Sequence, residues 1–120
     1  MRPTIPALAA CLLFAAASQS VAREGAYVAC DNGLRCFKAP CPSTTLRDLA
    51  TGRLWKGTSP DIGGLSEGDQ RRIRKADALY YGRLVLRGHV ARPANGPSTL
   101  VVTGIGRKAK PAERRHCPKG

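Results

Sequence analysis

The four cysteines that follow the first 22 residues constrain this chain more than any other feature. A domain of about 100 residues buries only about 60 to 65% of the surface that its unfolded chain exposes, so crosslinks add much to its stability. An even number of cysteines in a small exported chain predicts disulfides. We therefore expect two disulfides, formed among Cys30, Cys36, Cys41 and Cys117.

The spacing of these cysteines favours one of the three pairings that four cysteines allow. Cys36 and Cys41 enclose a short segment with Pro40, which can close as a local loop. Cys30 is then left to bond Cys117, and this bridge would enclose nearly the whole domain and contribute about 4 to 5 kcal/mol in the chain-entropy model. We favour this pairing, and the other two stay open.

The N-terminal residues have the pattern of a secretory signal peptide. Arg2 precedes an apolar run over residues 5–17, and Ser20-Val21-Ala22 fits the small-x-small cleavage rule. We expect cleavage after Ala22 and export to the periplasm or the medium. A lipid anchor at Cys11 is disfavoured because apolar residues follow it directly. The apolar run is also too short for a membrane span, which takes about 20 residues.

The mature chain is expected to be a single small domain at residues 23–106, followed by a polar, basic C-terminal tail at residues 107–120. The tail should be extended unless Cys117 anchors it. The whole chain carries 20 Lys and Arg against 8 Asp and Glu, a net charge of +12. Cleavage removes only one of these charges, that of Arg2, and leaves +11. The electric field of such a positive charge attracts anionic polymers and lipids, although the charge can also act only to keep the protein soluble.

Alternating apolar residues predict a mainly β domain with one helix, in the order β-β-β-α-β-β. Turn signals at residues 31–33, 50–52 and 93–97 separate the strands. The first strand should turn back through residues 34–36 as a hairpin, and Leu54 and Trp55 should pack in the second pair of strands. The strands are expected at residues 25–30, 43–49, 53–56, 82–90 and 98–106. In the fourth strand, the alternation places Arg83, Val85 and Arg87 on one face and Leu84, Leu86 and Gly88 on the other.

Residues 66–79 are the one expected helix. Ser66 can cap it, with Asp69 three positions later in the first turn. A narrow apolar stripe would face the core, formed by Ile73, Ala76, Leu79 and Tyr80. The expected architecture is α+β: a small, disulfide-stapled, five-stranded sheet or OB-like barrel, of the type that binds oligonucleotides or oligosaccharides.

Several segments resemble a family of uncharacterised exported bacterial domains, a domain of unknown function. They are Cys36–Cys41, the loop at Asp61–Ser66, Gly82–Val85 and Leu100–Val102. The resemblance covers roughly residues 27–106. It implies a small envelope or secreted domain, and it brings no established activity and no catalytic residues.

Candidate catalytic and metal sites have simpler interpretations. Residues 64–68 match the G-x-S-x-G nucleophile elbow, but an elbow needs a preceding strand and a large α/β sheet, so Ser66 is better interpreted as a helix cap. Neither His89 nor His116 has an acidic neighbour in sequence to orient it as a base. The cysteines and His116 lack the paired C-x2-C spacing of zinc sites, and Cys36, between Arg35 and Lys38, should be paired rather than reactive. We expect no enzyme, no cofactor and no metal.

Basic side chains are the best candidates for a binding site. Residues 70–75 resemble the X-B-B-X-B-B pattern associated with sulfated polysaccharides, although they can also form a solvated helix face. Aromatic residues make up only 5% of the chain, which disfavours single-stranded nucleic acid because base stacking needs exposed rings. The expected polyanion-binding residues are Arg71, Arg72, Arg74, Lys75, Arg83 and Arg87, extended by Lys108, Lys110, Arg114 and Arg115.

The predicted function is non-enzymatic binding of anionic envelope polymers or lipids by a monomer. The alternative is a disulfide-framed protein-interaction or inhibitor module, in which the loop at residues 36–43 presents Phe37 and Lys38 to an envelope protein or another partner.

Overall fold

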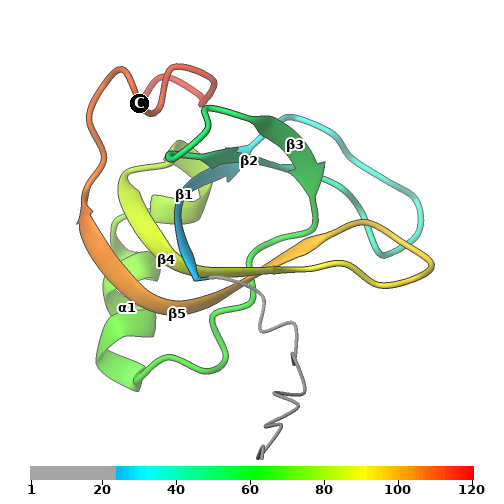
Figure 1. The fold of residues 1–120 in the computed structure, drawn as a ribbon, viewed down its shortest axis with the longest axis horizontal. Helices are drawn as coiled ribbons and strands as arrows, with labels where there is room; N and C mark the ends of the chain where they lie inside the picture. The colour runs from blue at the N-terminus through cyan, green and yellow to red at the C-terminus, as the bar shows by residue number, and fades with distance from the viewer. Residues whose placement is uncertain (1–23) are drawn as a thin grey trace, which may run out of the picture.

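The computed structural model describes residues 24–120, which fold into five strands and two short helices (Figure 1). The chain is mainly β, as predicted. The predicted signal peptide at residues 1–22 and the rejected lipidation site Cys11 lie outside the described residues. The elements are β1 (Gly25–Asp31), β2 (Thr44–Asp48), β3 (Leu54–Gly57), α1 (Glu67–Lys75), α2 (Ala78–Tyr81), β4 (Leu84–Ala91) and β5 (Thr99–Lys108).

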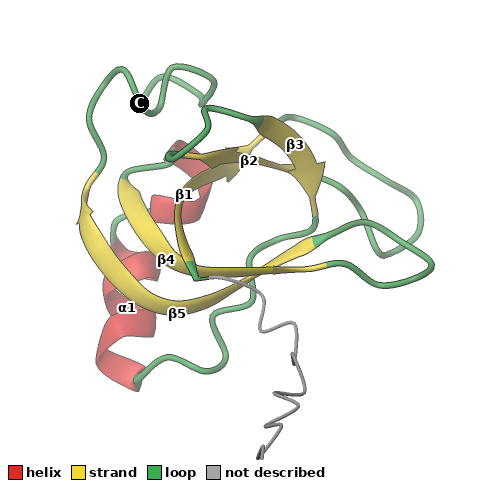
Figure 2. Ribbon diagram, viewed as in Figure 1, coloured by secondary structure: helices red, strands yellow, loops and turns green. Residues whose placement is uncertain are grey.

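The strands form one antiparallel sheet in the order β3-β2-β1-β4-β5. The sheet curls strongly, so that its two edges approach each other (Figure 2). Its hydrogen-bonded ladders leave β3 and β5 as edges, and the sheet is not closed. Two isolated parallel bridges nevertheless connect the two edges. One joins Gly57, at the end of β3, to Ser98, just before β5, and the other joins Asp61, in the loop after β3, to Val101 of β5.

The main core lies on the inner face of the curled sheet. Because successive side chains of a strand point to opposite faces, every second residue of the central strands faces inward. Leu46 of β2 and Leu100 of β5 are both fully buried there. Ile73 of α1 and Ala78 of α2 join the same cluster, so the two helices pack against it.

A second, smaller cluster lies on the outer face, where sequence alternation alone would place polar residues. Val28 of β1 and Val85 of β4 are buried there beneath Ala109, with Cys117 packed beside them. Ala109 N also donates a 2.9 Å hydrogen bond to the carbonyl oxygen of Arg83. The C-terminal segment is therefore anchored to the outer face of the sheet rather than extended into solvent.

The predicted hairpin between residues 25–30 and 34–36 is wrong. The antiparallel partner of β1 is β2, with Ala29 opposite Leu46, and residues 34–36 form no strand. The reason lies in Asn32, whose backbone N–H donates to the carbonyl oxygen of Ser43 at 2.9 Å. Its side-chain amide also donates to the carbonyl oxygen of Pro42 at 2.9 Å. The chain thus leaves the sheet at Asn32 and rejoins it only after Ser43.

The single predicted helix is in fact two helices. Ser66 caps α1 as expected, because its Oγ accepts a 3.2 Å hydrogen bond from Asp69 N. The helix ends at Lys75 because Asp77 adopts the left-handed conformation, with φ 47°, which redirects the chain into α2. As a result Tyr80, predicted to be in the apolar stripe, is 44% exposed. Within residues 24–120 neither helix has the length and hydropathy to cross a membrane.

Candidate anion-binding site

Two disulfides are present within the described residues, and the longer one positions the candidate site. Cys36 bonds Cys41, whereas Cys30 of β1 bonds Cys117 across a sequence separation of 87 residues. Gly82, at the turn between α2 and β4, lies directly against the longer bridge. A Cβ atom on Gly82 would lie 2.6 Å from Cys117 Sγ, and its φ of +65° also favours glycine. The bridge therefore holds the C-terminal segment beside the start of β4.

An ion pair further fixes the C-terminal segment. Arg107 of β5 donates to both carboxylate oxygens of Glu113, at 2.6 and 2.7 Å, and Lys110 N donates to the same group at 2.8 Å. The hydrogen bond from Arg107 is the main reason that the pKa of Glu113 falls to about 2. This carboxylate stays ionised and is engaged by its own partners. Its hydrogen bonds go to the Arg107 guanidinium and to the Lys110 backbone N–H.

Three basic side chains line an open cavity of about 260 Å³ beside this segment, which we name the cationic cavity. They are Arg83, Lys108 and Arg114, and Ala109 and Gly120 complete the lining. Among residues 24–120, no Asp or Glu side chain lines this cavity. Like charges held this close repel one another, so an anion that enters the cavity relieves an unfavourable interaction.

Tyr81 of α2 holds two of these three cations in place. Arg114 donates from Nε to the carbonyl oxygen of Tyr81 at 3.1 Å. The guanidinium carbon of Arg83 lies 4.6 Å from the centre of the Tyr81 ring, a cation–π contact. Within residues 24–120, no hydrogen bond engages the two terminal nitrogens of Arg114. They are thus free to donate to a ligand.

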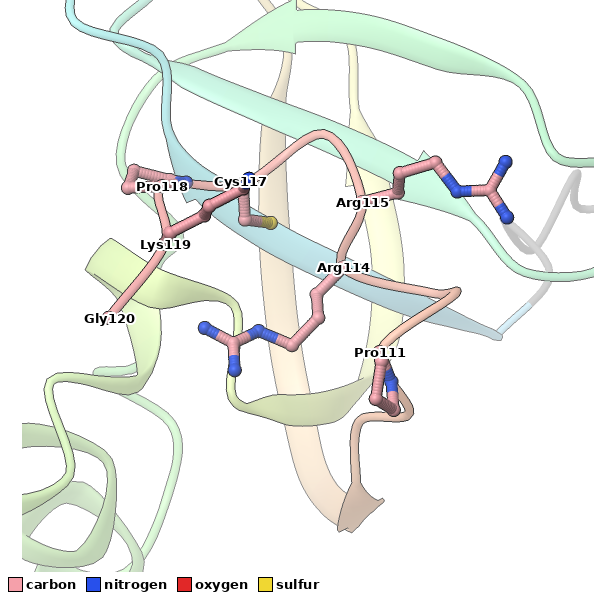
Figure 3. A pocket seen from close by; sticks show the side chains of 7 residues that line it. All are labelled: Pro111, Arg114, Arg115, Cys117, Pro118, Lys119 and Gly120. Atoms are coloured by element: carbon pink, nitrogen blue, oxygen red, sulfur yellow. The ribbon is translucent and has the colours of Figure 1, made fainter.

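A second cavity, of about 330 Å³, adjoins the cationic cavity and shares Arg114 and Gly120 with it. We name it the proline-lined cavity (Figure 3). Figure 3 shows the Arg114 side chain turned towards the start of β4, whereas the Arg115 side chain points in the opposite direction. In the part of the chain that the structure describes, this cavity has no Asp or Glu side chain in its lining either. The lining residues are Pro111, Arg114, Arg115, Cys117, Pro118, Lys119 and Gly120.

The structure divides the predicted polyanion-binding residues among separate places. Arg83, Lys108 and Arg114 come together in the cationic cavity. Arg87 lies instead in a cavity with Arg107 and Glu24. The α1 cations surround the buried Ile73 as exposed side chains, and none of them lines the cationic or the proline-lined cavity; they are Arg71, Arg72, Arg74 and Lys75. Lys110 is exposed and lines neither of these two cavities.

Sequence reasoning missed two residues of the site. Tyr81 is not among the predicted site residues, yet it contacts both Arg83 and Arg114. Lys119 had no assigned role, and it lines the proline-lined cavity. The one signal that could have found Lys119 is its place two residues after Cys117, because the bridge to Cys30 brings its neighbours onto the sheet.

His116 lies against the longer disulfide. Its Nε2 is 3.4 Å from Cys117 Sγ, and burial lowers the pKa of the imidazole below its ordinary value. Ligand atoms of Cys30, His116 and Cys117 lie within 4.8 Å of one another, a spacing that suits a metal ion. Both sulfur atoms are bonded to each other, however, and metals bind the thiolate form. The arrangement as it stands is a disulfide with a neutral imidazole beside it.

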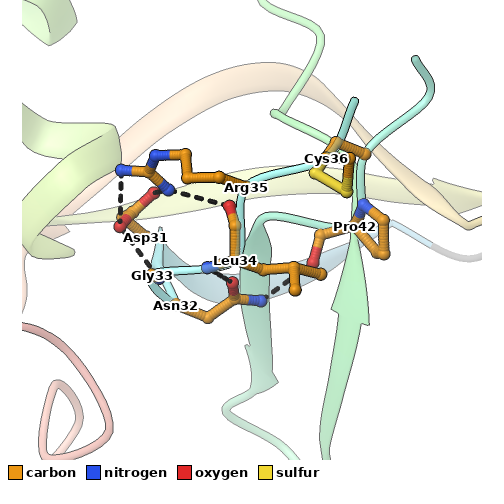
Figure 4. Close-up of polar contacts among 8 residues, drawn as sticks. Asp31, Asn32, Gly33, Leu34, Arg35, Cys36 and Pro42 are labelled. Atoms are coloured by element: carbon orange, nitrogen blue, oxygen red, sulfur yellow. Dashed lines mark hydrogen bonds and ion pairs between the residues drawn. A yellow bond between two sulfur atoms is a disulfide. The ribbon is translucent and has the colours of Figure 1, made fainter. Parts of the chain in front are cut away.

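The loop closed by the shorter disulfide is held by polar contacts at its base (Figure 4). The Asp31 carboxylate accepts hydrogen bonds from Gly33 N at 3.0 Å and from Arg35 Nη1 at 3.1 Å. Asn32 Oδ1 accepts another from Leu34 N at 2.9 Å. The tip of the loop carries Phe37, which is fully exposed.

Comparisons with known proteins add no relative. No family model matches the chain, and neither does any curated protein or solved structure. The resemblance of residues 27–106 to a family of exported domains therefore stays a prediction. The assignment of the candidate site is based on geometry and charge alone.

Proposed function

We propose that this protein is an exported, non-enzymatic domain that binds anionic polymers or lipids of the cell envelope. The observation that carries the proposal is the cationic cavity, where Arg83, Lys108 and Arg114 meet without an Asp or Glu side chain. Guanidinium groups bind phosphate, sulfate and carboxylate through paired charge-assisted hydrogen bonds. The net charge, +12 for the whole chain and +11 once Arg2 is removed by the expected cleavage, adds a long-range attraction that raises the local concentration of polyanions.

Two features support export. The first 22 residues have the pattern of a signal peptide. Two disulfides hold the described chain, and such bonds form and persist in oxidising compartments. A periplasmic or secreted location would also bring the protein to the anionic polymers and lipids of the envelope.

We further propose an OB-like barrel. The strand order and the helices between β3 and β4 support it, since barrels of this type are five-stranded and partly open. The parallel bridge between Gly57 and Ser98 lies where the edges β3 and β5 would meet to close such a barrel. Small barrels of this type bind oligosaccharides and oligonucleotides, which agrees with an anionic polymer as ligand, although this is an analogy of fold alone.

Chromatography on heparin tests the proposed function. We expect the double variant Arg83→Gln/Arg114→Gln to elute at clearly lower salt than the unchanged protein, because two contacts to the anion are lost. Each lost contact should reduce the steepness of the plot of log K against log salt concentration by about one. The matched control is Arg72→Gln/Arg74→Gln on α1, which removes the same charge outside both cavities. A larger loss of retention in the control would place the binding surface on α1 and contradict the proposal.

The exposed loop supports a second candidate function, docking to a protein partner. Phe37 is fully exposed on a loop that the disulfide Cys36–Cys41 and the Asp31–Arg35 ion pair hold in shape. A preorganised loop loses little conformational entropy on binding. We expect Phe37→Ser to abolish capture of a partner in pull-downs from envelope and medium. The control Leu54→Ser changes an exposed apolar residue elsewhere, and equal losses in both variants would contradict this function.

A further inference from the structure

The cationic and proline-lined cavities differ in chemistry but share one guanidinium group, that of Arg114. We propose that together they bind a sugar phosphate unit, with the phosphate in the cationic cavity and the sugar ring in the proline-lined cavity. This inference rests on the proposed function and names the unit of the anionic ligand that the site recognises.

The cationic cavity suits a phosphate group. Its three cations are more than enough to neutralise the charge of about −1.5 to −2 that a phosphate monoester carries near neutral pH. Arg114 reaches the cavity with both terminal nitrogens available, and these two donors match two phosphate oxygens. Because Tyr81 holds both guanidinium groups, little side-chain entropy is lost when the ligand binds.

The proline-lined cavity suits a sugar ring. Two proline rings and the sulfur of Cys117 give it apolar walls, and its volume of about 330 Å³ is that of a small-molecule site. Lys119 lies in the same lining and can donate hydrogen bonds to hydroxyl oxygens. Inorganic phosphate alone would leave these walls uncovered. A ring that carries a phosphate group covers them while its charge stays in the neighbouring cavity.

Isothermal titration of the oxidised protein with glucose 6-phosphate, inorganic phosphate and glucose, all at the same low salt concentration, tests this inference. We expect glucose 6-phosphate to bind about tenfold more tightly than inorganic phosphate, and glucose to bind more weakly than either. Lys108→Gln should weaken both phosphate ligands about tenfold or more through the loss of a charge-assisted contact. Pro111→Ser should remove the advantage of the sugar phosphate and leave the affinity for inorganic phosphate unchanged.

The control Lys110→Gln removes the same charge as Lys108→Gln from a residue that lines neither cavity, and it should leave all three affinities nearly unchanged. Equal affinities for glucose 6-phosphate and inorganic phosphate would overturn the inference. If the two affinities are equal but heparin retention still depends on Arg83 and Arg114, the proposed function stands and only the sugar phosphate inference fails. If neither heparin nor phosphate binding responds to the cavity variants, both proposals fail.

The same chemistry can come from a phosphorylated polysaccharide or from a lipid headgroup. Competition against bound glucose 6-phosphate distinguishes the two sources. A soluble phosphomannan would displace it if the natural ligand is a polymer, and vesicles containing phosphatidylinositol would displace it if the ligand is a lipid. Displacement by either supports the sugar phosphate unit. Displacement of about half of the bound glucose 6-phosphate by inorganic phosphate at equal concentration would show equal affinities and would overturn it.

Discussion

Replacement of Cys30 and Cys117 by Ser is expected to lower the free energy of unfolding by about 4 to 5 kcal/mol, because their bridge closes a very long loop. The two residues lie 87 positions apart in sequence. The matched variant, Cys36→Ser/Cys41→Ser, opens a loop with a separation of only 5 and should cost about 2 kcal/mol. Urea denaturation of the two variants, each with its other disulfide intact, measures the difference.

The size of this effect matters because small domains have total stabilities of about 5 to 15 kcal/mol. Loss of the longer bridge should bring the chain close to unfolding and should release the C-terminal segment from β1. Anion binding should fall with it, since Arg114 would no longer be held beside Arg83 and Lys108, which the pairing of β4 with β5 keeps together. A greater loss of stability in the Cys36→Ser/Cys41→Ser variant would show that the local loop, and not the C-terminal bridge, holds the domain together.

Leu46→Ala is expected to cost about 2 to 5 kcal/mol of unfolding free energy, because the side chain is fully buried in the main core and its loss leaves a cavity. Leu54→Ala provides the control. Leu54 lies on the neighbouring strand β3 and is 49% exposed, so its loss should change stability by only about 0.5 kcal/mol. Thermal or urea unfolding of the two variants measures both values.

This pair of variants also tests the register of β2 and β3. Leu54 was predicted to pack inside, but it lies opposite Arg47 on the outer face, while Leu46 pairs with Trp55 on the inner face. A shift of one residue in the register would exchange the two faces. If Leu54→Ala cost more than Leu46→Ala, the register would be wrong.

The strands were predictable because their signal is local. Alternation in residues 82–90 and 98–106 indicated β4 and β5 with small errors at their ends, and turn residues separated β2 from β3. The predicted hairpin after β1 was wrong because Asn32 donates hydrogen bonds across the loop to the carbonyl oxygens of Pro42 and Ser43. No local sequence pattern indicates these contacts. The helix was too long because the left-handed residue at its break is Asp77, not the glycine that usually marks such a position.

The candidate site was only partly predictable, because it depends on contacts between distant residues. The basic residues were evident from composition, and the helical run at residues 71–75 was the most obvious cluster. The cationic cavity instead combines Arg83 with Lys108 and Arg114, which the antiparallel pairing of β4 with β5 and the bridge at Cys117 bring together. One part of this arrangement was open to sequence reasoning, because anchoring of the tail was expected if Cys117 formed a disulfide.

A heteronuclear NMR titration of the oxidised protein with a heparin-derived oligosaccharide tests most directly whether the disulfide-anchored C-terminal segment builds the anion-binding site. We expect the largest amide shifts at Arg83, Lys108 and Arg114 and in the turn that follows Tyr81. Shifts concentrated at residues 71–75 of α1, with the C-terminal segment unaffected, would contradict it.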